Sequence, residues 1–259
     1  RLRRKPSERA RTGAEAHRPA QHPPCPLHVQ QRDHLQRDRT RTIATGDTTV
    51  QLGRLSVSFV RDSRDNPFDP THGTFTTVDV SLVSRFLGGS ENFIRFFGEH
   101  QRMYRLTPLA DVLFASNVRL GLARPYGRST TIPISERFFA GGSTTLRGFG
   151  FEQAGPRAPD PNRPGRTRPL GGNALVIANA ELRFPLLRRL RLGGAIFYDG
   201  GNVFARISDM SLRDFTHTVG FGLRIKTPLG PLRLDFGALL RRAPGVPRTQ
   251  LHITFGNPF

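Results

Sequence analysis

Apolar and polar residues alternate along most of the chain after about residue 51. In residues 251–255, for example, Leu, Ile and Phe share one face while His and Thr share the other. This two-residue period recurs near 54–61, 74–86, 92–106, 112–122, 176–184, 190–198, 219–226, 232–240 and 251–259, most weakly in 92–106. Since successive side chains of a strand point to opposite faces, the pattern predicts an all-β antiparallel fold of about nine strands.

The connections between these expected strands alternate in length. Short turns near 107–108, 185–189 and 227–230 alternate with long connections at 124–172, 200–214 and 241–249. Outer-membrane barrels have short periplasmic turns and longer outer loops, so the alternation favours a transmembrane β-barrel over a soluble β-sandwich. An open sheet of nine strands would leave unpaired edges in lipid. We therefore predict an incomplete barrel, completed by further strands or by another chain.

Residues 1–50 show no period and are rich in Arg and Pro, so we predict a disordered basic tail there and the barrel portion in residues 51–259. The single cysteine, Cys25, excludes a disulfide framework within the chain. The formal charge is +19, and residues 1–45 hold only 11 of the 39 Lys and Arg residues. The basic excess permits nucleic-acid binding, but aromatic-basic interleaving and a reading helix are missing. We expect no nucleic-acid partner, and assign the excess to the lumen or to lipopolysaccharide-facing loops.

Three motifs carry a family resemblance. Arg147-Gly148-Phe149 follows a Gly-Gly turn, Phe197-x-Asp199-x-Gly201 comes later, and the chain ends in Gly-Asn-Pro-Phe. Together they resemble the carboxyl-terminal barrel of the BamA/TamA family of outer-membrane assembly proteins, over about residues 55–259.

The resemblance implies that the loop bearing Arg147, Gly148 and Phe149 folds into the barrel lumen. There Arg147 would meet Asp199, whose position in the alternation faces the lumen, and Gly148 would allow close backbone approach. Leu146 stands where the family commonly has Val, a mild departure. We call the predicted arrangement of Arg147, Gly148, Phe149 and Asp199 the lumen-loop lock.

The carboxyl end resembles the family's assembly signal and barrel seam, which we expect at Phe255, Gly256 and Phe259. In the family the last strand pairs weakly with the first to form a lateral gate. The usual first strand is not identifiable in this sequence.

The implied function is insertion or translocation of outer-membrane proteins in the bacterial outer membrane, without ATP or cofactor. The expected partners are outer-membrane lipid, unfolded outer-membrane protein clients and periplasmic assembly partners. A polypeptide-secretion pore of the same superfamily remains an alternative. So does a structural or non-functional barrel fragment.

Catalytic and metal sites have little support in the sequence. Residues 62–73 hold three Asp within eight positions, but their spacing differs from that of a calcium loop, and Asp and Asn in such turns usually bond the backbone. Zinc-ligand spacing and a Gly-x-Ser-x-Gly nucleophile elbow are also missing. We therefore expect a protein that is not an enzyme and has no metal or cofactor.

Overall fold

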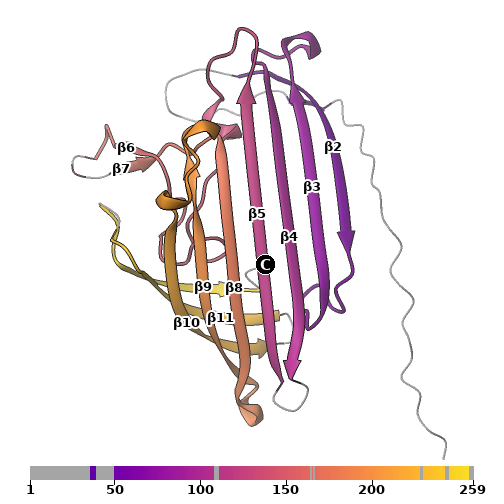
Figure 1. Cartoon of the computed structure of the whole chain (residues 1–259), viewed down its shortest axis with the longest axis vertical. Helices are drawn as coiled ribbons and strands as arrows, with labels where there is room; N and C mark the ends of the chain where they lie inside the picture. Colours follow the sequence, from indigo (N-terminus) through magenta and orange to yellow (C-terminus); the bar gives the residue numbers. More distant parts are fainter. Residues whose placement is uncertain are drawn as a thin grey trace, which may run out of the picture.

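The computed structural model of the chain describes residues 36–38, 50–107, 111–163, 165, 167–227, 230–242 and 245–256. These residues form one long antiparallel sheet, curved around a concave face, and one small hairpin (Figure 1). The helices within them are single 3-10 turns, and none could cross a membrane.

The strands of the curved sheet are β1 (Gln36–Asp38), β2 (Leu52–Asp62), β3 (Gly73–Val83), β4 (Phe93–Thr107), β5 (Val112–Pro125), β8 (Ala174–Leu187), β9 (Leu192–Phe204), β10 (Thr216–Thr227), β11 (Gly230–Leu239) and β12 (Thr249–Phe255). The hairpin consists of β6 (Arg157–Pro159) and β7 (Thr167–Pro169). The 3-10 turns are η1 (Arg85–Leu87), η2 (Ile134–Glu136), η3 (Arg188–Leu190), η4 (Ile207–Asp209) and η5 (Leu212–Asp214).

Strands that follow one another in the chain lie side by side, except that β5 pairs with β8 across the connection that contains the hairpin. The sheet contains nine long strands, β2 to β5 and β8 to β12, as the period predicted. Within the described residues β1 and β12 each pair on one side only, so the wall does not close. The predicted all-β, incomplete barrel is confirmed.

Two details differ from the predictions. Residues 36–38 form β1 against β2, although they fall in the expected disordered tail. Three residues are too few to show a period, and the unpaired edge of β2 offers backbone partners whatever the side chains. Leu190, expected in a strand, lies in η3, because Arg191 adopts a left-handed φ of 52° and turns the chain into β9. The rest of residues 1–49, with Cys25, lies outside the described residues.

Alternation separates the two faces of the wall. On β10 and β11, Phe221 is 60% exposed while Asp235 on the opposite face is fully buried. The convex face carries a band of exposed apolar side chains, as a lipid-facing surface requires. Its members include Val57, Val80, Ile94, Val118, Ile196, Tyr198, Val219, Phe221, Leu223, Leu234, Leu251, Ile253 and Phe255.

The lipid contact of this band can be tested by fluorescence, because the chain contains no Trp. In vesicles of brominated lipid, Trp introduced as Phe221→Trp or Leu234→Trp should be strongly quenched. Trp at Phe138→Trp, on the concave side and buried, should stay bright. Equal quenching at all three positions would exclude this orientation.

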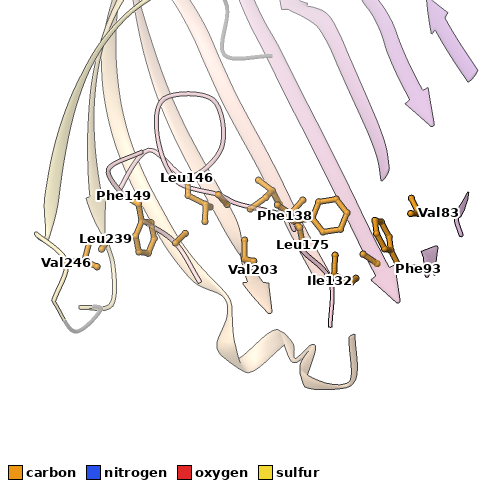
Figure 2. Packing of buried hydrophobic residues seen from close by; sticks show 14 residues of the cluster. Val83, Phe93, Ile132, Phe138, Leu146, Phe149, Leu175, Val203, Leu239 and Val246 are labelled. Atoms are coloured by element: carbon orange, nitrogen blue, oxygen red, sulfur yellow. The ribbon is translucent and has the colours of Figure 1, made fainter. Parts of the chain in front are cut away.

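The long connection between β5 and β8 folds back against the concave face. Its side chains Ile132, Phe138, Leu146 and Phe149 pack on inward residues of the wall such as Leu175, Val203 and Leu239 (Figure 2). Gly121 of β5 makes room for one of them, since a Cβ there would lie 2.7 Å from the Phe138 ring. This apolar layer fixes the connection inside the wall.

The loop between β2 and β3, residues 63–72, is held by its own carboxylates. Asp62 bonds the Arg64 guanidinium at 2.7 Å. Asp65 accepts the Thr71 backbone N–H at 2.8 Å and the His72 N–H at 3.2 Å. Asn66 accepts the Phe68 N–H at 2.9 Å. Among the described residues, no group of three or more His, Cys, Asp or Glu could hold a metal ion.

The pKa of Asp65 gives this loop a pH dependence. Burial raises the pKa of Asp65, but hydrogen bonds from Thr71 and His72 outweigh it and hold the pKa below its ordinary value of 3.8. A lowered pKa in the folded state means that these bonds stabilise the loop above pH 3.8 and lose that contribution as pH falls through the folded value.

Asp65→Asn should therefore lower the free energy of unfolding at neutral pH, and the difference from wild type should shrink towards zero below the folded pKa. Urea unfolding followed by circular dichroism at a series of pH values measures it. A difference that persisted at the acid end would contradict the assignment to the ionised carboxylate.

Candidate functional site

Arg147 lies inside the wall, 1% exposed, and binds Asp199 of β9. Its Nε and Nη2 donate to the two oxygens of the Asp199 carboxylate at 2.9 and 2.7 Å, and its backbone N–H donates to the same carboxylate at 3.0 Å. The guanidinium carbon also lies 3.4 Å from the centre of the Phe197 ring. The structure thus brings together the two residues that the sequence predicted as a pair.

Further charged side chains surround this pair. Arg147 Nη1 donates to Glu181 of β8, which also accepts from Arg183 at 2.8 Å and lies 3.2 Å from Arg224 of β10. Asp235 of β11 binds Arg224 and lies 3.2 Å from Arg233. The buried carboxylates are therefore occupied by guanidinium groups.

Strand register explains why these groups meet. Asp199 is directly opposite Asn179 on β8 and Thr218 on β10, so all three face inward in one row. Glu181 is opposite Phe197 in the next row. Because directly opposite residues in an antiparallel sheet lie on the same face, inward polar residues of neighbouring strands form a contiguous polar patch.

The pKa of Arg147 shows which force prevails in this patch. Burial alone lowers the pKa of Arg147, but the hydrogen bonds and charge of Asp199, with the charges of Glu181 and Asp235, raise it above its ordinary value. The guanidinium therefore stays charged. Because burying such groups costs desolvation, we assign the patch a positional role more than a stabilising one.

The backbone of the same loop is held by side chains from separate strands. Arg233 of β11 donates to the Ser143 carbonyl at 2.9 Å, and Asn179 of β8 donates to the Thr145 carbonyl at 2.6 Å. Arg119 of β5 donates to the Thr144 carbonyl. His252 Nε2 lies 3.0 Å from the Arg147 carbonyl, linking the loop to β12.

Gly148 and Phe149 complete the predicted lumen-loop lock. A Cβ on Gly148 would lie 2.5 Å from Thr218 Oγ1 and 2.9 Å from Leu239 Cδ2, so the loop approaches β10 and β11 as closely as glycine permits. Phe149 is 2% exposed and belongs to the apolar layer. All four residues of the lock therefore contact the inside of the wall or each other.

The predicted assembly signal lies at the edge of the sheet. Phe255, 56% exposed, is the last residue of β12 and faces outward. Gly256 lies just beyond the strand, with a φ of 90°, and donates its N–H to Pro231 O at 2.8 Å. Phe259 lies outside the described residues. Among those residues β12 pairs only with β11, which leaves its outer edge free.

A family model described as the Omp85 superfamily domain matches residues 15–259. The chain belongs to the Omp85 superfamily. This confirms the resemblance to the BamA/TamA family, and the Omp85 relatives include both bacterial and eukaryotic proteins.

The outer membrane protein assembly factor BamA of Nitratidesulfovibrio vulgaris is 28% identical over 182 residues, which cover 70% of this chain and 22% of that protein. A SAM50-like protein of Schizosaccharomyces pombe is 31% identical over 208 residues, covering 75% of this chain and 41% of the relative. The chain thus spans well under half the length of these Omp85 relatives.

The fold also has a counterpart among solved structures. The crystal structure of BamA from Haemophilus ducreyi lacking POTRA domains 1–3 superimposes with a TM-score of 0.65, over 79% of this chain and 42% of that one. The sequence identity is 19%, so this likeness establishes the Omp85 barrel fold alone.

The sequence did not predict several residues of the charged patch around Arg147 and Asp199. Glu181, Arg224 and Asp235 share the inward register of Asp199, and that register was the signal that could have found them. The sequence places His252 only on the polar face of the last strand. Its partner is a backbone carbonyl, which leaves no mark in a sequence.

Proposed function

We propose that this chain is the barrel part of a membrane-protein assembly factor, which inserts or translocates outer-membrane proteins without nucleotide or cofactor. Membership of the Omp85 superfamily supports this, as do relatives named outer membrane protein assembly factor BamA and sorting and assembly machinery component 50 homolog. The observation that carries the proposal is that the outer edge of β12 is unpaired among the described residues and lies beside a loop that is fixed inside the wall.

The free edge of β12 would act by β-augmentation. A strand that pairs on one side only presents unpaired backbone N–H and C=O groups, which an incoming strand can satisfy. In a membrane the gain is large, because unpaired backbone groups in lipid cost several kcal/mol each. The edge would then template the first strand of an unfolded client.

The loop would keep the rest of the wall in shape during this exchange. Its polar contacts reach β5, β8, β9 and β11 through several charged or amide side chains. Within the described part of the chain, its one side-chain hydrogen bond to β12 is that of His252. We infer that the lock stabilises the curvature of the wall and leaves the last strand comparatively free.

The outer and inner faces of the curved sheet suggest the membrane location and the partners that we propose. The apolar band faces outer-membrane lipid, and the partners are unfolded barrel proteins and assembly proteins on the periplasmic side. BamA relatives favour a bacterial outer membrane, but the SAM50 relatives come from organisms such as Schizosaccharomyces pombe and Bos taurus. We therefore propose an outer membrane as the location of the protein, without assigning it to one kind of organism.

Photocrosslinking during assembly tests the proposal. A photoreactive residue at Leu251 on β12 should crosslink to incompletely folded barrel clients in the intact protein. The same photoreactive residue in place of Val118 on β5, which is 51% exposed on the same outer face, should not crosslink to these clients. Crosslinks at Val118 equal to those at Leu251 would contradict a templating edge.

The same experiment separates the rival function. A polypeptide-secretion pore would pass its substrate through the lumen, so crosslinks would form at an inward position such as Gln101. Crosslinks at Gln101 without crosslinks at Leu251 would replace assembly by secretion. A protein that crosslinked at neither position would have a structural role only.

A further inference from the structure

A basic hollow opens at the end of the wall that carries the short turns. It has a volume of about 400 Å³, and residues 69–71 of the β2–β3 loop line it together with strand ends from β4 to β11. Its arginines come from four different strands or turns: Arg105, Arg183, Arg188, Arg191 and Arg224. Arg183 and Arg224 also bind Glu181 beside the lumen-loop lock, whereas Arg105, Arg188 and Arg191 form no ion pair or hydrogen bond with the lock among the described residues.

The acidic residues that line the hollow do not balance this charge. They are Asp69 and Asp111, and Asp111 is already 3.2 Å from Arg188. Arg105 and Arg191 form no side-chain hydrogen bond or ion pair with any described residue. Arg224 is 6% exposed and differs from these two, because its guanidinium binds Glu181 and Asp235.

Arg105 and Arg191 are the two arginines of the hollow that have no acidic partner among the described residues, whereas Arg183, Arg188 and Arg224 already bind Asp or Glu. Two such guanidinium groups beside a concave space are suited to a phosphate oxyanion. Arg presents a planar fork of N–H donors that matches phosphate oxygens in pairs, and a phosphomonoester carries a charge of about −1.5 to −2 at pH 7. The hollow is larger than a phosphate group needs, so it can also enclose a small body attached to it, such as glycerol.

We propose that this hollow binds the phosphate group of a small organic phosphate. Arg105 and Arg191 hold the phosphate at the rim, and the guanidinium groups of Arg183, Arg188 and Arg224 add positive charge to the lining. A lipid headgroup, whose phosphodiester carries one negative charge, and a soluble phosphomonoester both offer phosphate oxygens to these arginines. The two arginines that hold the phosphate, Arg105 and Arg191, are separate from the edge of β12 and from the lumen loop, so the site can be tested apart from the assembly function proposed above.

Calorimetric titration of the intact protein in phosphatidylcholine nanodiscs tests the proposal. Glycerol 1-phosphate should bind, and glycerol should not. Arg105→Gln/Arg191→Gln should weaken binding by about 100-fold, as expected when two charge-assisted contacts are lost. Arg189→Gln/Arg206→Gln is the matched control, since it removes the same charge at exposed positions that do not line the hollow and should bind normally.

Two results would overturn the site. One is the absence of binding by the wild-type protein, and the other is an equal loss in both double variants, which would show attraction by net charge alone. Nanodiscs that contain phosphatidylglycerol then identify the source of the ligand. Weaker binding of added glycerol 1-phosphate in them shows that a lipid headgroup occupies the hollow, and unchanged binding shows a soluble phosphate.

Discussion

Arg147→Met should lower the free energy of unfolding by about 3–5 kcal/mol, because it leaves buried carboxylates without their partner. Asp199 would lose its bidentate contact, and Glu181 would lose one of its guanidinium donors. The Met side chain has a similar length. The lost free energy of unfolding therefore reports the missing charge and the missing N–H donors of the guanidinium group more than a change in volume. Urea unfolding in lipid vesicles, followed by far-ultraviolet circular dichroism, measures the effect.

A double variant and a control separate the pair from its surroundings. Arg147→Met/Asp199→Asn should cost clearly less than the sum of the two single changes, because the second change removes the unpaired charge. Arg102→Met on β4 makes the same substitution at an exposed arginine whose guanidinium lies 5.7 Å from the Tyr104 ring and forms no ion pair among the described residues, and it should cost under about 0.5 kcal/mol. Additive single effects would show that Arg147 and Asp199 do not act as a unit.

Gly237→Ala should displace the lumen loop without removing any of its polar contacts directly. A Cβ on Gly237 of β11 would lie 2.4 Å from the Arg147 carbonyl oxygen and 2.7 Å from the carbonyl carbon. Because backbone atoms cannot move aside as the end of a flexible side chain can, the loop itself must shift. We expect this to lower the free energy of unfolding by about 1–3 kcal/mol. Trypsin should then cleave after Arg147, a site that is almost fully buried in the wild-type protein.

The matched control is Gly98→Ala on β4. A Cβ there meets only the far end of the Phe96 ring, at 3.3 Å, and a small rotation of that ring accommodates it. We expect unchanged resistance to trypsin at Arg147 in this variant. Equal cleavage in both alanine variants would mean that a general loosening of the sheet exposes the loop. Displacement of the loop by the new Cβ on β11 would then not be the cause.

The sequence predicts the wall well, because the two-residue period is a local property that every strand expresses independently. It also predicts Arg147 and Asp199, since motif resemblance and inward register agree on them. Residues such as Arg119, Asn179 and His252 could not be found in this way. They bind carbonyl groups of residues 143–147, and a carbonyl group is present at every position of every chain.

The same limit applies to the small elements. The three-residue strands β1, β6 and β7 are too short to show a period, and they form where a neighbouring segment offers backbone partners. The assignment of Gly256 to the last strand differs from the structure for a related reason. Its φ of 90° ends the strand, and only the folded backbone shows that this glycine uses its conformational freedom there.

The unequal distribution of contacts to the lumen loop has a mechanical consequence. Pulling β9 away from the loop breaks three hydrogen bonds between Arg147 and Asp199. Pulling β12 away breaks one hydrogen bond to the loop within the described residues, that of His252. A lateral force applied evenly to the wall should therefore open it at β12 first. The loop and the strands bound to it would then move as one rigid body, and the last strand would be the part that bends away under load.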